Sequence, residues 1–264
     1  MGLGREEVDR LCAAAVSAAA TGRDVALAWL GRHRVWPKGS LDIVTDADLA
    51  SREAVRAFLA RNCPDEAVFD EEGGIMPGPQ GRFWVVDPLD GTVNASAGFP
   101  LWSVSVALLE HGRELAGAVC APGEGAYSAA AGRGARCGGR PLAPSRTRAL
   151  RDAVVSVTVA PGYSPQEMAL ALACFGKLAR RVRGVRVFCS GALELCWVAS
   201  GKLDACVCPA QAFFSAAAGV LIAREAGCSV LDLEGRSYRA GESSGLVAAC
   251  TPELASEVLA TLPV

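Results

Sequence analysis

Residues 84–94 of this 264-residue chain read W-V-V-D-P-L-D-G-T-V-N, and this stretch decides the fold. Its first three residues continue an apolar run from Phe83, which is typical of a buried strand. Two carboxylates, Asp87 and Asp90, follow directly, and Gly91 permits a tight turn after them. Because α/β folds bind ligands at the carboxyl ends of their strands, we expect a site here.

The two carboxylates at this strand end indicate a cation. Asp87 and Asp90 repel each other, and a hard divalent ion is the usual way to neutralise such a pair. Thr92 can hold a water molecule, and the backbone amides after it can approach an anion. A plain alternative is an acidic turn in which Asp90 caps a short helix. The stretch alone leaves both interpretations open.

Two further acidic clusters point the same way. Asp70, Glu71 and Glu72 follow a short apolar run and precede a glycine-rich loop, and Asp46 and Asp48 lie where a strand meets a helix. Taken alone, the second cluster also fits a helix cap with acids favoured by the helix dipole. Three acidic strand ends together predict a Mg²⁺ or Ca²⁺ site that handles phosphate.

The periodicity of apolar residues predicts a layered α/β fold. It predicts helices over 6–30, 49–61, 165–180, 191–200 and 215–226, and strands at 67–69, 83–86, 103–110, 115–121, 125–131, 154–159, 185–188, 204–208 and 230–232. Residues 138–151, rich in Pro, Arg and Ser, are the best candidate for a linker. We expect an N-terminal αβ half, residues 1–145, that carries the carboxylate site. A C-terminal α/β half, residues 146–264, completes the pocket, and both are parts of one body.

The composition excludes several classes of protein. With 28 acidic and 26 basic residues, the chain lacks the basic excess that nucleic-acid-coating or membrane-surface proteins need. Two histidines leave little room for a histidine-based triad, and 51% hydrophobic residues exclude disorder. There is no secretory signal pattern and no run of about 18 apolar residues, and the eleven cysteines are scattered. We therefore expect a cytoplasmic protein with free thiols and without a membrane span.

At this point the sequence resembles the inositol monophosphatase family. Residues 84–94 match that family's first signature, W-x-x-D-P-[ILV]-D-G-T-x-N, and residues 42–48, 70–72 and 190–227 support the match in the right order. The resemblance implies an αβαβα five-layer sandwich, commonly a homodimer. It also implies Mg²⁺-dependent hydrolysis of small phosphate monoesters.

The resemblance implies a set of metal ligands. Glu71 and Asp87 correspond to carboxylate ligands of a first Mg²⁺, beside the carbonyl of Leu89. Asp87 would bridge to a second ion, with Asp90 as a further ligand.

It implies catalytic and substrate-binding residues as well. Asp48, Thr92 and Glu71 correspond to the catalytic residues, and the first two orient and activate the attacking water. The amides of Gly91 and Thr92 would face the phosphate, and Lys38 corresponds to a lysine on a mobile loop near the site.

The second family signature, W-D-x-A-A-G, is altered. Phe214 stands at its tryptophan, Ser215 at an aspartate that ligates the second metal, and Cys208 at a glutamate that binds a substrate hydroxyl. All three belong to the expected substrate-binding set. Loss of one carboxylate should weaken a dication site severely, so one Mg²⁺ or none is expected rather than two or three. A shifted alignment in which Glu194 or Asp204 supplies the charge is the alternative.

The leading prediction is a Mg²⁺-dependent phosphatase-like hydrolase acting on a small phosphate monoester other than myo-inositol phosphate. The alternative is a repurposed member that has lost metal-dependent hydrolysis. Such a protein would catalyse a cyclisation, elimination or isomerisation, or would bind an apolar ligand in the old pocket. A silent binding or regulatory protein is the third possibility. The expected partners are a small-molecule substrate and a second copy of the chain, with neither nucleic acid nor membrane.

Overall fold

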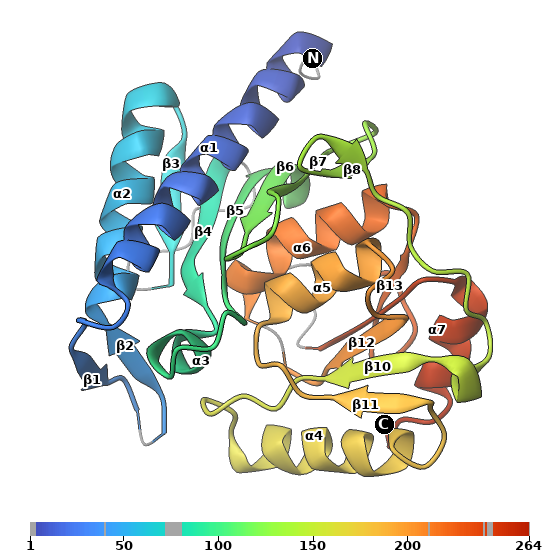
Figure 1. The fold of residues 1–264 in the computed structure, drawn as a ribbon. Coiled ribbons are helices and arrows are strands. Elements are labelled where there is room, and N and C mark those ends of the chain that lie inside the picture. Colours follow the sequence, from blue (N-terminus) through green and yellow to red (C-terminus); the bar gives the residue numbers. More distant parts are fainter. Residues whose placement is uncertain are drawn as a thin grey trace.

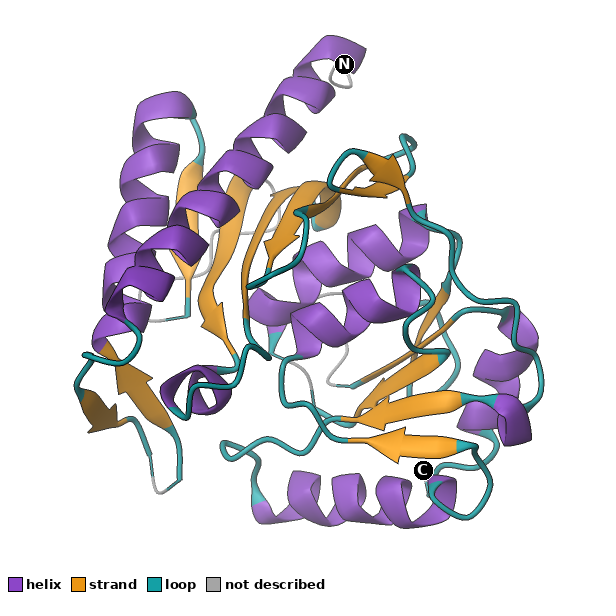
Figure 2. Ribbon diagram, in the orientation of Figure 1, coloured by secondary structure: helices purple, strands orange, loops and turns teal. Residues whose placement is uncertain are grey.

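The structure is a computed structural model that describes residues 4–39, 41–71, 81–210, 212–239, 241 and 245–263. Helices and sheets alternate in five layers (Figures 1 and 2). The three helical layers hold, in order, α1 (Arg5–Trp29) with α2 (Asp46–Asn62), α5 (Gly191–Ala199) with α6 (Phe213–Glu225), and α4 (Pro165–Leu178) with α7 (Pro252–Leu259). The predicted αβαβα sandwich is confirmed.

The first sheet lies between α1 and α2 on one face and the central helices on the other (Figure 1). Among the described residues it has seven strands in sequence order, parallel between the first two and antiparallel elsewhere. They are β3 (Ala67–Asp70), β4 (Arg82–Asp90), β5 (Ser103–Glu110), β6 (Arg113–Cys120), β7 (Tyr127–Ala130), β8 (Ala135–Cys137) and β9 (Arg140–Pro141). The predicted meander over 103–131 is confirmed and continues through two more short strands.

The second sheet lies between the central helices and the α4–α7 layer. Its order is β11-β10-β12-β14-β13, with β10 parallel to both of its neighbours and the other pairs antiparallel. The strands are β10 (Val154–Val157), β11 (Gly184–Arg186), β12 (Ala205–Cys208), β13 (Ser229–Asp232) and β14 (Leu246–Ala249).

Four small elements complete the described chain. A hairpin of β1 (Val35–Pro37) and β2 (Ile43–Thr45) precedes α2, α3 (Thr92–Ser96) follows β4, and the 3-10 turn η1 (Leu150–Asp152) precedes β10. The predicted linker over 138–151 holds β9 and η1 and runs between the two sheets.

Strand β4 extends beyond its predicted end. Asp87 pairs with Ser105 and Asp90 with Ser103, so β4 has one residue more than its partner between these pairs. That is a β-bulge, and it accommodates Pro88, which has no N–H to donate to a regular ladder. The expectation of a strand ending at residue 86 was therefore wrong. The bulge places both carboxylates within the strand.

Helix α1 combines a long apolar sequence with a buried face. By length and composition it is the one helix among the described residues that is long and apolar enough to cross a membrane, with a mean hydropathy of 1.3. Core helices of globular proteins pass the same test. Leu11, Ala15 and Ala19 are fully buried, and the helix packs on α2, β5 and β6. Its packing is that of a core helix.

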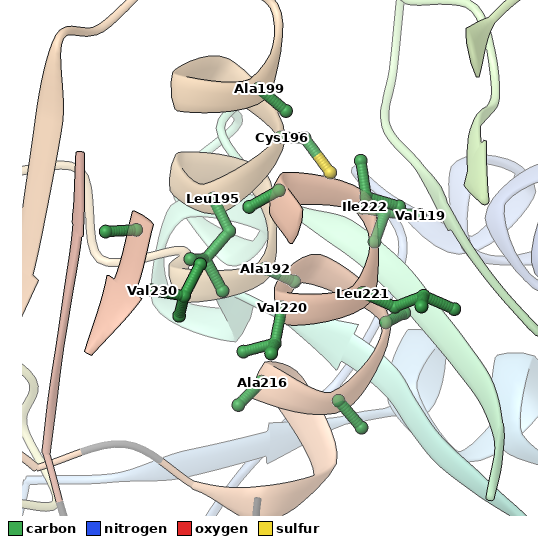
Figure 3. Packing of buried hydrophobic residues seen from close by; sticks show 14 of the residues in the cluster. Val119, Ala192, Leu195, Cys196, Ala199, Ala216, Val220, Leu221, Ile222 and Val230 are labelled. Atoms are coloured by element: carbon green, nitrogen blue, oxygen red, sulfur yellow. The ribbon is translucent and has the colours of Figure 1, made fainter. Parts of the chain in front are cut away.

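The central helices α5 and α6 pack closely side by side (Figure 3). A Cβ added to Gly219 would lie 2.8 Å from Leu195 Cδ1 and 3.2 Å from the carbonyl oxygen of Ala192. Glycine therefore allows this close approach.

All eleven cysteines of the chain are free thiols, as predicted.

Candidate active site

A pocket of about 880 Å³ opens at the carboxyl end of β4. It lies where the β4 bulge, α3, the segment after β10 and the start of α6 meet, so residues from both predicted halves form it. Of the sequence-predicted site residues, it is lined by Glu71, Asp87, Leu89, Asp90, Gly91, Thr92 and Ser215.

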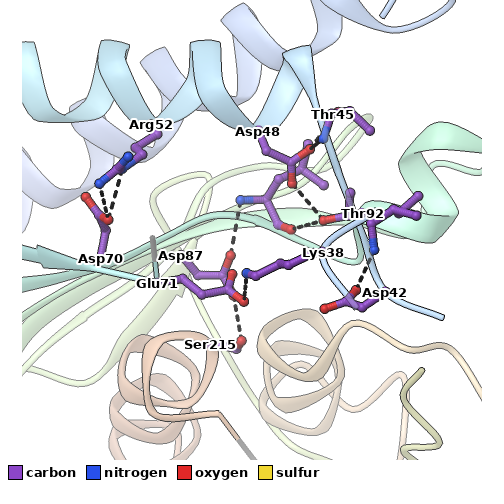
Figure 4. A network of polar contacts seen from close by, with 12 residues as sticks. Lys38, Asp42, Thr45, Asp48, Arg52, Asp70, Glu71, Asp87, Thr92 and Ser215 are labelled. Carbon is purple, nitrogen blue, oxygen red and sulfur yellow. Dashed lines mark hydrogen bonds and ion pairs between the residues drawn. The ribbon is translucent and has the colours of Figure 1, made fainter. Parts of the chain in front are cut away.

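Asp87 is the most buried acid of this set, with 4% of its surface exposed. Its Oδ1 accepts a hydrogen bond from the Leu89 amide at 3.1 Å, and its Oδ2 accepts one from Ser215 Oγ at 2.6 Å (Figure 4). Burial raises its pKa well above the usual range, and the nearby charges of Asp90 and Glu71 raise it further.

Asp90 is held from the other side of the bulge. Its Oδ2 accepts hydrogen bonds from Ser190 Oγ at 2.7 Å and from the Ala192 amide at 2.9 Å. Desolvation nevertheless raises its pKa to about 6, and the charge of Glu71 adds to this effect. Ser190 carries no direct signal in the sequence beyond its place in the supporting run 190–227.

Asp48 belongs both to a helix cap and to the site. It is the third helical residue of a capping box, in which its Oδ2 accepts from the Thr45 amide at 2.9 Å and from Thr45 Oγ1 at 2.6 Å. Its Oδ1 lies 2.7 Å from Thr92 Oγ1, which is also 3.0 Å from the Leu89 carbonyl oxygen (Figure 4). Desolvation raises the pKa of Asp48 above its usual value. The helix-cap interpretation of this cluster is confirmed, and a catalytic role of Asp48 stays a prediction.

Glu71 is paired with Lys38. The Nζ of Lys38 lies 2.6 Å from Glu71 Oε1, and both side chains are partly exposed. Lys38 directly follows β1, and its amide bonds the carbonyl of Asp42 across the hairpin. The hairpin therefore brings this lysine to the acidic side of the pocket.

Other acids of the same clusters have structural roles. Asp46 accepts from the Arg34 amide at 2.7 Å, and Asp70, whose side chain is fully buried, pairs with Arg52 and Arg56 at 2.9 and 2.6 Å. Glu72 lies outside the described residues. The clusters at 46–48 and 70–72 thus each contain one described acid near the pocket, Asp48 or Glu71, and one that forms scaffold contacts, Asp46 or Asp70.

Phe214 and Cys208 do not line the pocket. The ring of Phe214 packs against Phe69 with centroids 5.2 Å apart. Cys208 is fully buried, and its Sγ lies 3.1 Å from Thr158 Oγ1, which does line the pocket. Direct contact of Phe214 or Cys208 with a substrate therefore remains a prediction from sequence.

Neither Asp204 nor Glu194 lines the pocket, so neither supplies the carboxylate expected at position 215. Asp204 accepts from the Val154 amide at 2.7 Å, away from the pocket. Glu194 is fully buried on α5, with Oε2 at 3.4 Å from Thr158 Oγ1. Burial raises its pKa to about 7. The alternative of a shifted alignment has no support in this geometry.

The sequence analysis missed one wall of the pocket. Residues 158–163, together with Met168, Cys189 and Ala210, form the wall that the second predicted half contributes. The segment follows the carboxyl end of β10, which is parallel to both neighbours and is thus a position where α/β sheets bind ligands. That topology was the available signal, since the segment carries no charged motif.

Comparison with known proteins identifies the family. The sequence profile of the inositol monophosphatase family matches residues 7–263. The chain belongs to this family. It is 35% identical to the Nus factor SuhB of Pasteurella multocida, over 84% of the chain and 83% of that protein. It is also 35% identical to a histidinol-phosphatase of Mycobacterium tuberculosis, over 87% of the chain and 88% of that protein.

Solved structures of the inositol monophosphatase family have the same fold. An IMPase from Thermotoga maritima has a TM-score of 0.85 at 28% identity and covers 96% of both chains. The suhB protein of Bartonella henselae has a TM-score of 0.88 at 27% identity, with 96% of this chain and 98% of that chain covered. The family includes phosphatases that act on different small phosphates, so membership alone does not name a substrate.

Enzymes of the inositol monophosphatase family generally depend on Mg²⁺, and the pocket is lined by oxygen donors of the kind that this ion binds. Burial is the main cause of the raised pKa values of Asp87 and Asp90, and the hydrogen bonds from Ser215 and Ser190 offset it in part. Carboxylate and carbonyl oxygens are the ligands Mg²⁺ prefers. Among the residues that the structure describes, however, no group of three or more His, Cys, Asp or Glu is arranged to hold a metal ion. The neutral Ser215, bonded to Asp87, leaves the site one carboxylate poorer.

Proposed function

We propose that the protein is a Mg²⁺-dependent phosphatase that hydrolyses a small phosphate monoester other than myo-inositol phosphate. One observation carries the proposal. Thr92, which is bonded to Asp48, lines the same pocket as Glu71, Asp87 and Asp90. Acids gathered from separate strand ends, next to a hydroxyl held by a base, form a constellation suited to metal-assisted hydrolysis.

The Asp48–Thr92 pair supplies a base for the attacking water. Thr92 Oγ1 lies 2.7 Å from Asp48, so a water bonded to this hydroxyl can pass its proton towards the carboxylate. The raised pKa of Asp48 makes it a stronger proton acceptor than an exposed aspartate.

The turn after β4 supports the phosphate. Gly91 has a φ of 96°, a conformation that glycine adopts without strain, and the chain then enters α3. Gly91 and Thr92 line this part of the pocket, and their backbone amides would approach the anion.

We propose that one Mg²⁺, rather than two or three, serves the reaction. Glu71, Asp87 and the Leu89 carbonyl would hold it, and when bound it supplies positive charge to the phosphate oxygens. A second ion would find a neutral hydroxyl at Ser215 instead of a carboxylate. It would also find Asp87 Oδ2 already accepting the hydrogen bond from that hydroxyl.

Phosphate release from a panel of monoesters, measured with Mg²⁺ and with EDTA, tests the proposal. We expect strict Mg²⁺ dependence, and we expect Asp48→Asn to lower kcat by about 10²–10⁴-fold, the usual range for loss of a general base. Asp46→Asn is the matched control, because Asp46 lies in the same helical turn but bonds Arg34 instead. Full activity in EDTA, or in Asp48→Asn, contradicts the proposal.

The same assay addresses the second candidate function, a reaction without metal-dependent hydrolysis. The Ser215–Asp87 bond favours it, because it satisfies Asp87 Oδ2 without a cation. Retained turnover in EDTA without phosphate release supports this second function. The homodimer and the cytoplasmic location remain predictions.

A further inference from the structure

On the pocket wall formed by residues 158–163, Met168, Cys189 and Ala210, polar side chains donate to nearby backbone carbonyls. Tyr163 Oη donates to the Ala210 carbonyl at 2.6 Å, and Cys189 Sγ donates to the Val159 carbonyl at 3.0 Å. Burial raises the pKa of Tyr163, so its hydroxyl stays a neutral donor. The donors of both groups are therefore already used before a substrate binds.

The hydroxyl of Thr158, on the same wall, also has partners. Thr158 Oγ1 lies 3.1 Å from Cys208 Sγ and 3.4 Å from Glu194 Oε2, and both of these partners are fully buried behind it. The residue that would offer a hydroxyl to a substrate thus already has buried partners.

The rest of this wall is apolar. It is formed by the side chains of Val159, Ala160, Pro161, Met168 and Ala212. Two acids, Asp42 and Glu167, also line the pocket, and each accepts a hydrogen bond from a backbone amide, at 2.9 and 2.7 Å. Their charge disfavours a leaving group that carries a second anion.

We propose that the preferred substrate is the phosphate monoester of an apolar alcohol, with a cyclic or branched hydrocarbon leaving group and few hydroxyls. This inference rests on the proposed function and names its substrate class. On the wall formed by residues 158–163, a polyol would leave hydroxyls facing bonded or apolar side chains, whereas a hydrocarbon ring gains from burial. Tyr163 is the main specificity residue, because its ring lines the pocket and its hydroxyl is anchored to Ala210.

Two esters that share a six-membered ring test the preference. Cyclohexyl phosphate and myo-inositol 1-phosphate differ in the ring hydroxyls, and each unpartnered hydroxyl should lower kcat/KM by about tenfold. With several hydroxyls on inositol, we expect kcat/KM for cyclohexyl phosphate to be at least about 100-fold higher. Equal values, or a preference for the inositol ester, overturn the inference.

Variants of Tyr163 test its role separately from the chemistry. Tyr163→Ala should lower kcat/KM for cyclohexyl phosphate by about tenfold or more, through the lost apolar contact. Methyl phosphate, whose leaving group does not reach the ring, should change by less than about twofold. Tyr163→Phe keeps the ring but loses the bond to Ala210, so it should lose less kcat/KM for cyclohexyl phosphate than Tyr163→Ala does. An equal loss with both esters in Tyr163→Ala overturns the specificity role.

Binding separates failure of the inference from failure of the proposed function. Calorimetry with the same two ring esters, on Asp48→Asn if the wild type hydrolyses them, should show cyclohexyl phosphate binding at least about tenfold tighter. If no ester is hydrolysed, the proposed function fails, and this comparison still decides the inference. Tighter or equal binding of myo-inositol 1-phosphate overturns it.

Discussion

At the scale of single residues, the Ser215–Asp87 hydrogen bond joins the central helix α6 to the most buried acid of the pocket. The hydroxyl donates to a carboxylate that is 4% exposed and whose pKa is already raised by burial. A carboxylate at position 215 would place a second anion against it. Two such anions repel strongly at low dielectric unless a cation lies between them. Serine thus makes the folded state less dependent on a metal.

Ser215→Asp should therefore make stability depend on Mg²⁺. In EDTA we expect the variant to lose about 3 kcal/mol of unfolding free energy, because it buries an uncompensated charge. Saturating Mg²⁺ should recover most of that loss and raise its Tm more than that of the wild type. Thermal denaturation with and without Mg²⁺ measures both effects. Ser215→Ala, which removes only the hydrogen bond, is the control, and equal Mg²⁺ shifts in all three proteins would contradict the argument.

Glu194 gives a prediction about pH. Burial raises its pKa to about 7, whereas in an unfolded chain it is about 4.3. Between these values the folded state binds more protons than the unfolded state, so stability falls as pH rises through this window. Glu194→Gln should remove that fall and be more stable than the wild type at pH 8 by up to about 3 kcal/mol.

Urea denaturation at pH 5 and pH 8 measures this effect. Glu53→Gln is the control, because Glu53 is exposed on α2. The difference in unfolding free energy between this variant and the wild type should be the same at both pH values. A Glu194→Gln difference that is the same at both pH values would show that the carboxyl does not titrate in this window.

The residue types predicted where the acids lie close together. They did not predict which acid of each cluster lies at the pocket and which forms scaffold contacts. Asp48 and Asp46 stand two positions apart, and only the tertiary contacts with Thr92 and Arg34 separate a site acid from a structural one. Such long-range contacts have no local signature. The apolar wall at 158–163 was missed for a related reason, because apolar residues indicate burial and do not distinguish a pocket surface from a core.

At the scale of elements, hydrophobic periodicity predicted the long helices well. The expectation over 6–30 corresponds to α1 (Arg5–Trp29), and that over 165–180 to α4 (Pro165–Leu178). Short elements were missed, among them β14 (Leu246–Ala249) and α7 (Pro252–Leu259), because so few residues carry little period. The β4 bulge was missed because Pro88 indicates a turn locally, whereas pairing with β5 keeps the strand going.

The packing of α5 on α6 depends on Gly219. Gly219→Ala should destabilise the protein by about 1–3 kcal/mol, because the added methyl overlaps Leu195 and the backbone of Ala192. Gly176→Ala is the matched control on α4, where an added Cβ meets nothing within 4 Å. That variant should gain up to about 1 kcal/mol from helix propensity. Chemical denaturation of both variants measures the contrast, and equal effects would exclude close packing as the cause.

At the scale of the whole molecule, the two predicted halves share one core. A single hydrophobic cluster includes Phe83, Val85 and Ala107 of the first sheet, together with Leu195 and Ile222 of the central helices. Helix α6 contacts both β6 and β13, so it covers one face of each sheet. The pocket is built across the same junction, with acids from the first sheet and the apolar wall from the second. In the described structure both halves thus contribute to this cluster and to the pocket, whereas two further clusters lie within one half each.

This shared core predicts that the chain unfolds as one unit and that residues 1–145 do not fold alone. Removing α5 and α6 exposes a whole face of the first sheet, and no other helix of that half is placed to cover it in the described structure. In the full chain, far-ultraviolet circular dichroism and tryptophan fluorescence should report coincident transitions. The 1–145 fragment should show no cooperative transition and should bind a hydrophobic dye. Two separate transitions, or a cooperatively folded fragment, would instead mean that the halves are independent domains whose contact is not needed for folding.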